Sequence, residues 1–480
     1  MTDHKNLIGS EWVAASDGAT FENRSPANLD DLIGTFPRLT REDTLRAIES
    51  ARAAFPAWAA MPGPARGAIL DKAGQIIAAR LDEYAAALTR EEGKTLAEAK
   101  GEITRSRDLF RFYGGEGWRI RGDTLPGAVA DEFLYTRREP LGVVAIITPW
   151  NFPSAIPAWK IAPALAYGNT VVFKPASDAP HSGLLLVEAL QEAGLPPGVI
   201  NFVTGAGATV GDTLVASPDV KAVSFTGSYA IGTGIYAKAI KNMTRVQLEM
   251  GGKNPLIVLN DADLELATRL AVTGGFGLTG QACTASSRVI VEDGIARQFV
   301  DSLAGAARAL VVGDGLAAGT QMGPAINQGQ LETDLSYVEV GRQEGAKLVA
   351  GGDRARDGGH YVQPTVFDEV EPGMRIAQEE IFGPVIGVIR ARNVDDAIER
   401  ANGIGFGLSA GIVTNDLRAA FAFANRVEAG VVKINEPTTG LALHMPFGGF
   451  KHSSANTFKE QGNAAIEFYT RTKSVYIKHG

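Results

Sequence analysis

The sequence contains only one cysteine, Cys283, among its 480 residues. A single cysteine cannot form a disulfide within the chain, which is in keeping with a reducing compartment. The sequence also lacks any apolar run approaching the ~18 residues of a membrane-spanning helix, and its start, MTDHKNLIGSEW, has no apolar signal-peptide segment. We therefore expect a protein of the cytoplasm that does not enter a membrane.

Long basic runs are absent as well. The net charge is −8, with 46 Lys and Arg against 54 Asp and Glu, which argues against nucleic acid or an anionic membrane surface as a partner. No His, Cys, Asp or Glu cluster has the spacing of metal ligands, so we expect no metal site. The length exceeds that of a usual single hydrophobic core and predicts two or three domains.

Residues 40–120 have a helical pattern. The apolar residues recur three and four positions apart, as one buried stripe of a helix requires, at Leu70, Ala73, Ile77, Leu81, Tyr84 and Leu88. Between residues 122 and 139 this period stops, and the segment EFLYTRRE is typical of an exposed strand or ribbon.

Short apolar runs then alternate with helical segments. The runs lie at residues 142–148, 170–174, 199–203, 221–227 and 245–252. Helices are expected in the gaps, at residues 154–166, 180–193 and 229–241. This order predicts a parallel α/β sheet, with ligands at the carboxyl ends of its strands.

A second α/β series predicts a second sheet. Its apolar runs lie at residues 254–259, 287–291 and 430–435. The tail, residues 466–480, alternates enough to form a strand that could pair with the ribbon near residues 132–139.

Cys283 lies in the stretch FGLTGQACTASSR, residues 276–288. A free cysteine is often a small buried hydrophobe, and that interpretation stays open. The small and polar neighbours, however, favour a reachable thiol. A thiol with a pKa near ~8.5 still needs a helix N-terminus or a positive dipole to become a nucleophile at neutral pH.

Two further residues have the chemistry that such a nucleophile needs. Glu249 ends a predicted strand before two glycines, where a general base could lie, although an ion pair with Lys253 is the alternative. Asn151 lies between Pro149 and Pro153. Its amide could stabilise an oxyanion, or it could serve only the turn.

A possible phosphate site lies at residues 225–232, FTGSYAIG, where a predicted strand turns into a helix. Backbone N–H groups and a helix dipole can bind a pyrophosphate there, but the full G-x-G-x-x-G pattern is missing. Lys174, at the end of another predicted strand, could reach a ribose or phosphate.

Taken together, these motifs resemble the aldehyde dehydrogenase superfamily over nearly the whole chain. The segments that carry the resemblance, in order and spacing, are TPWNFP, WKIAPAL, GNTVVFKPAS, FTGS, LEMGGKNP, GQACTASSR, EEIFGPV and MPFGGFK. The resemblance implies NAD(P)-dependent oxidation of a small aldehyde to a carboxylic acid.

The resemblance also implies a domain organisation. A Rossmann-type cofactor domain would comprise residues 1–121 and 141–252, and an α/β catalytic domain residues 253–450. A small β oligomerisation ribbon, residues 122–140 and 465–480, would join subunits in a homodimer or homotetramer.

Catalytic roles follow from the same resemblance. Cys283 would attack the aldehyde carbon, and the Asn151 amide with the Cys283 backbone N–H would hold the oxyanion. Glu249 would then activate water to hydrolyse the thioester, with Lys160 and Glu460 in proton relay or support.

Cofactor contacts are implied for one further set of residues. These are Thr148, Trp150 and Lys174 on the adenosine side, Gly207, Gly211 and Ile231 near the adenine, Gly227 and Ser228 at the pyrophosphate, Glu380 and Phe382 at the nicotinamide, and Gly251. Many NAD-preferring relatives carry glutamate at the position of Ser177, where it repels a 2′-phosphate. Serine removes this repulsion, so we expect NADP to be preferred, with NAD possible.

Within the superfamily, the chain looks most similar to α-ketoglutaric semialdehyde (2,5-dioxopentanoate) dehydrogenases. Those relatives commonly have arginine immediately before the cysteine, where this chain has Ala282, and arginine could pair with a substrate carboxylate. The alternatives are succinic semialdehyde, or an apolar or aromatic aldehyde in a pocket of Phe110, Trp159, Leu441 and His444.

Three other functions fit the sequence less well. A CoA-acylating relative typically lacks the acid at the Glu249 position. A cysteine hydrolase needs a histidine base, and none of the six histidines lies in a recognisable Cys-His motif. A non-catalytic protein of this fold would be expected to have lost Cys283 or Glu249.

Overall fold

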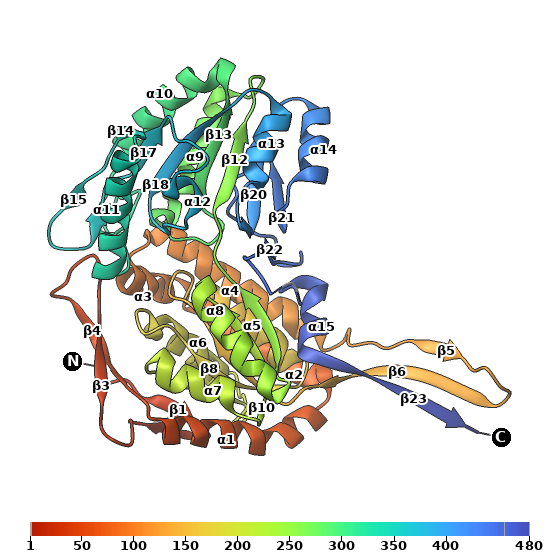
Figure 1. Ribbon diagram of the computed structural model, residues 1–480. Helices are drawn as coiled ribbons and strands as arrows, with labels where there is room; N and C mark the ends of the chain where they lie inside the picture. The colour runs from red at the N-terminus through yellow and green to blue at the C-terminus, as the bar shows by residue number, and fades with distance from the viewer. Residues whose placement is uncertain (1, 456, 480) are drawn as a thin grey trace.

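The computed structural model describes residues 2–455 and 457–479, and it contains two seven-stranded sheets, each covered by helices (Figure 1). In spatial order, the first sheet consists of β11 (Arg245–Glu249), β10 (Val220–Thr226), β7 (Val143–Ile147), β8 (Thr170–Lys174), β9 (Ile200–Phe202), β1 (Asn6–Ile8) and β2 (Glu11–Val13). The strands from β11 to β9 are parallel, and β1 and β2 are antiparallel additions that the sequence did not predict.

The predicted helical region is confirmed as four helices, α1 (Arg41–Ala60), α2 (Gly63–Ala79), α3 (Leu81–Glu92) and α4 (Leu96–Glu116). Capping boxes at Thr40 and Thr95 start α1 and α4, because each side chain accepts a backbone N–H of the first turn. Further helices of this half are α5 (Ala155–Ala166), α6 (Pro180–Glu192), α7 (Asp212–Ala216) and α8 (Tyr229–Ala239).

The second sheet consists of β14 (Lys347–Ala350), β17 (Thr365–Asp368), β18 (Val385–Ala391), β13 (Ser286–Glu292), β12 (Asn254–Val258), β20 (Ser409–Val413) and β21 (Val431–Ile434). All are parallel to their neighbours except β14. The three predicted runs are strands here, and β14, β17, β18 and β20 were not predicted.

Helices cover both faces of the second sheet. The apolar sides of α9 (Leu264–Phe276) and α10 (Asp293–Ala309) pack on one face. The other face is covered by α11 (Gln328–Gln343), α12 (Arg375–Gln378), α13 (Val394–Asn402) and α14 (Leu417–Arg426). Short strand pairs complete the fold: β3 (Thr20–Arg24) with β4 (Leu32–Pro37), β15 (Arg354–Arg356) with β16 (Tyr361–Val362), and β19 (Phe406–Gly407) with β22 (Phe450–Lys451).

A three-stranded ribbon of β5 (Thr124–Pro126), β6 (Glu132–Pro140) and β23 (Thr470–Lys478) extends away from the body, at the right of Figure 1. The predicted pairing of the tail with the ribbon is confirmed, because β23 runs antiparallel along β6. The predicted start of the tail strand is wrong, since Ala465–Tyr469 forms helix α15 and buries Phe468 and Tyr469. Met1 and Gly480, the outer limits of the predicted domains, lie outside the described residues.

No helix in the described part of the chain is long and apolar enough to cross a membrane. What matters for the site is the common edge of the first sheet. The parallel strands β7, β8, β10 and β11 all end there, and their carboxyl ends are followed by the segments that held the predicted motifs.

Candidate active site

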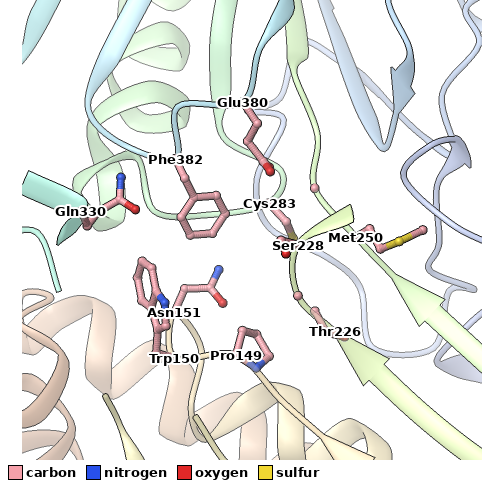
Figure 2. A pocket seen from close by; sticks show the side chains of 12 residues that line it. Pro149, Trp150, Asn151, Thr226, Ser228, Met250, Cys283, Gln330, Glu380 and Phe382 are labelled. Carbon is pink, nitrogen blue, oxygen red and sulfur yellow. The ribbon is translucent and has the colours of Figure 1, made fainter. Parts of the chain in front are cut away.

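A cavity of about 230 Å³ lies where segments of the two sheets meet (Figure 2). Its walls come from the segments that follow β7, β10 and β11, from the loop before β13, from α11 and from the segment before β18. It is lined by Pro149, Trp150, Asn151, Thr226, Gly227, Ser228, Met250, Gly251, Cys283, Gln330, Glu380 and Phe382.

Sequence reasoning had singled out most of these residues. It missed Pro149, Thr226, Met250 and Gln330 as lining residues. The first three are direct neighbours of predicted residues, so the motifs could have identified them. Gln330 comes from α11, and no local signal in the sequence points to it.

Cys283 lies partly exposed at the end of a strained loop. The preceding residues Leu278, Thr279 and Gly280 all have left-handed backbone angles, with φ of 55°, 58° and 69°. A Cβ atom on Gly280 would lie 2.3 Å from the Gly383 carbonyl oxygen, so glycine is required there. Such strain is held by the surrounding structure and is typical of functional loops.

Asn254 anchors the far end of this loop. Its Nδ2 donates to the carbonyl oxygens of Cys283 and Ala285, at 2.8 and 2.9 Å, while its Oδ1 accepts the Ser409 N–H at 2.9 Å. The backbone that carries the thiol is therefore fixed to β12 and β20 of the second sheet.

The residues after the Cys283 turn enter strand β13, so a helix N-terminus does not supply the positive dipole that the thiol needs. Burial raises the pKa of the Cys283 thiol to about 12, and the carboxyl groups of Glu380, Glu249 and Glu460 add to this effect. The sulfur is consequently a thiol at neutral pH, and it needs a base or a new positive charge to become a nucleophile.

Asn151 is buried, and its side chain does not serve its own turn. Its Nδ2 donates to the carbonyl oxygen of Gln281, two residues before the cysteine, at 2.9 Å. Figure 2 shows the amide and Cys283 facing the same cavity. The turn-only interpretation of Asn151 is therefore wrong, since its amide is tied to the loop of Cys283.

A buried ion pair supports Asn151 from behind. Lys94 Nζ donates to the Asn151 carbonyl oxygen at 2.7 Å and to Glu102 Oε2 at 2.6 Å. The other Glu102 oxygen accepts the N–H groups of Ser154 and Ala155, at 2.9 and 3.0 Å. Lys94 and Glu102 thus fix the turn between β7 and α5, and neither was predicted.

We expect Lys94→Met to lower the free energy of unfolding by about 3–5 kcal/mol. The substitution leaves Glu102 buried without its cation and removes the bond to the Asn151 carbonyl. Urea unfolding measures the change. Lys100→Met is the matched control, because Lys100 pairs with Asp82 on the surface and its loss should cost under about 1 kcal/mol. Equal effects of the two substitutions would contradict this account.

Glu249 ends β11 and is only 1% exposed. Its Oε2 accepts the Gly449 N–H and its Oε1 accepts Gln247 Nε2, both at 3.2 Å. The predicted alternative, an ion pair with Lys253, is wrong. Within the described residues Lys253 Nζ has no hydrogen-bond partner, and burial lowers its pKa to about 7.

None of Glu249, Lys160 and Glu460 is among the residues that line the cavity, although Met250, which follows Glu249, is. Lys160 Nζ donates to Ser224 Oγ at 2.9 Å, to Gln247 Oε1 at 3.3 Å, and to Glu460. Because Gln247 also donates to Glu249, a continuous path of hydrogen bonds runs from Glu249 to Glu460. Gln247 and Ser224 were not predicted.

The pKa of Glu249 lies well above its usual value because the carboxyl group is buried, and the charge of Glu460 raises it further. The carboxylate, which is the form that can accept a proton, therefore accumulates only as pH rises through this raised pKa. We expect turnover to rise about tenfold per pH unit on the acid side. A pH profile of kcat measures this limb, and Glu249→Gln should abolish it. A flat profile in the native enzyme would contradict the assignment.

Several predicted cofactor residues lie outside the cavity, namely Thr148, Lys174, Ser177, Gly207, Gly211 and Ile231. In the described part of the chain, Thr148 Oγ1 is buried without a partner, as is Thr226 Oγ1 on the cavity wall. Burial lowers the pKa of Lys174 to about 8, and its Nζ donates to the Pro175 carbonyl at 3.1 Å. Thr148, Thr226 and Lys174 thus place two unpartnered hydroxyl groups and an amino group at neighbouring strand ends. These groups fit a dinucleotide, which has polar atoms along its length.

The remaining predicted residues have the space and donors that the same ligand requires. Ser228 caps α8, with its Oγ accepting the Ile231 N–H at 3.4 Å, so the positive end of this helix faces the cavity. A Cβ atom on Gly207 or Gly211 would meet nothing within 4 Å. Ser177 Oγ donates only weakly, to the Gly205 carbonyl at 3.5 Å.

Glu380 reaches across the cavity towards Gly251. Its Oε1 accepts the Gly252 N–H at 2.8 Å, and a Cβ atom on Gly251 would lie 2.0 Å from its Oε2. Burial raises the pKa of Glu380 to about 7. Phe382 stands edge-on to Trp150, with ring centroids 5.4 Å apart. Because position 251 is a glycine, the Glu380 carboxyl group can approach the backbone of residues 251 and 252.

Two kinds of chemistry find no support in this geometry. None of the six histidines is among the cavity-lining residues, so no imidazole base accompanies the thiol as it does in a cysteine hydrolase. Within the residues that the structure describes, no group of three or more His, Cys, Asp or Glu side chains could hold a metal ion.

A cysteine facing a cavity between two α/β sheets, with a buried acid nearby, is the arrangement of an oxidoreductase that acts on aldehydes with NAD(P). The chain belongs to the aldehyde dehydrogenase family, whose pattern it matches over residues 12–475. The resemblance, the fold class and the enzyme class expected from the sequence are thereby confirmed.

Relatives of similar length support this assignment. The chain is 48% identical to the 2,5-dioxopentanoate dehydrogenase of Saccharolobus solfataricus, over 98% of each chain. It is 47% identical to the α-ketoglutarate semialdehyde dehydrogenase of Haloferax volcanii, over 99% of each. An NAD-dependent aldehyde dehydrogenase of Sinorhizobium meliloti has the same fold, with a TM-score of 0.97 and 37% identity over 100% of this chain and 95% of that one.

Solved structures of similar proteins include users of either cofactor. An NADP-dependent enzyme of E. coli superimposes with a TM-score of 0.96 and 38% identity, over 99% of this chain and 98% of that one. The fold therefore establishes NAD(P) as the cofactor class and leaves the choice between NAD and NADP to local residues.

Proposed function

We propose that this enzyme oxidises α-ketoglutaric semialdehyde (2,5-dioxopentanoate) to 2-oxoglutarate. The observation that carries the proposal is the 46–48% identity, over almost the full length, to three relatives named for this activity, from Saccharolobus solfataricus, Haloferax volcanii and Bacillus subtilis. Apolar or aromatic aldehydes and succinic semialdehyde are less well supported, because these three relatives are named for neither.

In the first half of the reaction, Cys283 Sγ bonds to the aldehyde carbon as its proton passes to water in the cavity. The Asn151 amide and the Cys283 backbone N–H hold the oxyanion of the thiohemiacetal. NAD(P), when bound, would supply the acceptor for the hydride that leaves the same carbon. This half ends with an acyl group on Cys283 as a thioester.

In the second half, Glu249 takes a proton from water, and the resulting nucleophile attacks the thioester. The acid leaves and Cys283 is restored. The hydrogen bonds from Gln247 through Lys160 to Glu460 favour a supporting role of Lys160 and Glu460, because the Gln247 amide donates to Glu249 and so holds its carboxyl group in place without accepting a proton from it. A buried acid of raised pKa is suited to this work near neutral pH.

Hydrolysis is favoured over transfer to coenzyme A. A CoA-acylating relative typically lacks an acid at the Glu249 position, whereas Glu249 is present here and lies next to Gly449. A non-catalytic role is disfavoured for the same reason, since both the thiol and the acid are retained.

Steady-state kinetics with three aldehydes test the proposed substrate. We expect kcat/KM to be highest for α-ketoglutaric semialdehyde, lower for succinic semialdehyde and lowest for benzaldehyde. Weakest activity on α-ketoglutaric semialdehyde would overturn the proposal and favour the apolar alternative.

We further propose that NADP is preferred over NAD, because Ser177 brings no negative charge to the ribose side near the buried Lys174. Replacement by glutamate should repel a 2′-phosphate. We expect Ser177→Glu to lower kcat/KM for NADP at least about tenfold. The value of kcat/KM for NAD should stay within about threefold of that of the native enzyme. Measuring kcat/KM for both cofactors tests this, and equal or better efficiency of the native enzyme with NAD would contradict it.

The proposed organisation keeps the domain roles expected from the sequence. The first half, residues 1–121 and 141–252, would bind the cofactor, and residues 253–450 would supply the nucleophile. The ribbon, residues 122–140 and 465–480, would join subunits into a homodimer or homotetramer in the cytoplasm. Support comes from its exposed apolar side chains, which include Leu125, Phe133 and Tyr476.

A further inference from the structure

Helix α4 carries an arginine on the side that faces the proposed site. Arg105 lies between Glu102, which binds the start of α5, and Ser106, whose Oγ lies 2.8 Å from Ser154 Oγ. Its guanidinium carbon is 5.8 Å from the centre of the Trp159 ring on α5. Arg105 therefore stands beside the helix that follows the Asn151 turn.

Arg105 also holds the loop that joins the two reacting groups. This loop, residues 436–449, begins next to the nucleophile, where Thr438 Oγ1 donates to the Thr284 carbonyl at 2.7 Å. It ends at the base, where Gly449 N–H donates to Glu249. Arg105 Nη1 donates to the Leu441 carbonyl in the middle of the loop.

Arg105 forms no ion pair in the described part of the chain, and the nearby Asp108 pairs with Arg107 instead. Arg105 Nη2 donates to the neutral side chain of Gln461 at 2.7 Å. Burial lowers its pKa, yet the residue is still partly exposed. With five N–H donors and only two hydrogen bonds, the guanidinium keeps donors for a ligand.

Two other buried arginines, Arg66 and Arg288, also form no ion pair among the described residues, but they bind backbone only. Arg288 donates from all three of its nitrogens to backbone carbonyls, those of Lys253, Arg400 and Ala401. Arg66 likewise donates only to carbonyls of neighbouring backbone. Those two side chains bind backbone carbonyls alone, whereas the Arg105 guanidinium binds one carbonyl and one neutral side chain and keeps N–H donors for an anion.

We propose that Arg105 binds the carboxylate of the semialdehyde substrate, at the end of the molecule away from the aldehyde that Cys283 attacks. The inference rests on the proposed function and adds to it the residue that selects an acidic aldehyde. A guanidinium pairs with a carboxylate through two parallel hydrogen bonds. The position of Arg105 also accounts for Ala282, since an arginine on α4 makes one beside the cysteine unnecessary.

The test compares an acidic aldehyde with a neutral one of the same chain length. In Arg105→Gln, we expect kcat/KM for 2,5-dioxopentanoate to fall about 30- to 100-fold, mainly through KM, because a charge-assisted pair is lost. For pentanal, we expect a change of no more than about threefold. Arg107→Gln is the matched control, because Arg107 lies on the same helix and pairs with Asp108. Arg107→Gln should leave kcat/KM unchanged for both aldehydes.

Each outcome decides the matter. An equal loss on both aldehydes would mean that Arg105 only fastens the loop, and no loss on either would mean that it is not involved; both overturn the inference. Arg105→Lys keeps the positive charge, so its kcat/KM for 2,5-dioxopentanoate should fall less than that of Arg105→Gln. If the glutamine variant does not fold, the lysine variant still tests the inference. The native enzyme's preference for acid over pentanal tests the proposed substrate separately, and a preference for pentanal would overturn both proposals.

Discussion

Replacement of Cys283 by alanine should abolish aldehyde oxidation, with kcat/KM falling by about 10⁴-fold or more. Cys283 is the only cysteine of the chain, and the other cavity-lining side chains with a nucleophilic oxygen are the buried Thr226, the capping Ser228 and Glu380. Without sulfur no covalent intermediate can form, so neither hydride transfer nor hydrolysis follows. The rate of formation of reduced cofactor, measured by its ultraviolet absorbance, reports the loss.

Cofactor binding separates this chemical effect from a folding defect. The Cys283→Ala protein should keep its affinity for NADP within about threefold, because the loop is held by Asn254 through backbone carbonyls and not through the thiol. Retention of more than a tenth of the native activity would refute Cys283 as the nucleophile.

Replacement of Glu249 by glutamine should separate the two halves of the reaction. We expect one equivalent of reduced cofactor to form rapidly per active site, and steady-state turnover to fall about 10²- to 10⁴-fold. Glutamine keeps the shape and the contacts to Gly449 and Gln247 but cannot accept the proton of water. Rapid-mixing kinetics measure the burst and the slow phase in one experiment.

Glu436→Gln is the matched control for this change. Glu436 lies at the start of the loop that ends at Gly449, and its exposed side chain pairs with Lys433. Its replacement should leave turnover unchanged. If Glu249→Gln also turned over at the native rate, another group would have to act as the base.

The sequence predicted the residues whose role depends on local chain direction. Asn151, Glu249 and Lys174 each follow or end a strand, and parallel strands bring their carboxyl ends to one edge of a sheet. Strands β14, β17, β18 and β20 were not predicted, because short buried apolar runs have no period that distinguishes them from helix.

Contacts between distant segments could not be predicted in the same way. Lys94 meets Asn151 across 57 positions, and Gly449 meets Glu249 across 200. Glu102 lies only eight positions from Lys94, but nothing in that spacing indicates that the pair is buried or that Lys94 reaches the Asn151 carbonyl. The high pKa of Cys283 has the same origin, since the acids that raise it come from separate segments.

The most direct test of the whole account is the mass of Glu249→Gln after a single turnover with 2,5-dioxopentanoate and NADP. The account predicts an acyl group bound to the peptide that contains Cys283, in an amount equal to the burst of reduced cofactor. A burst of reduced cofactor with Cys283 left unmodified would contradict it.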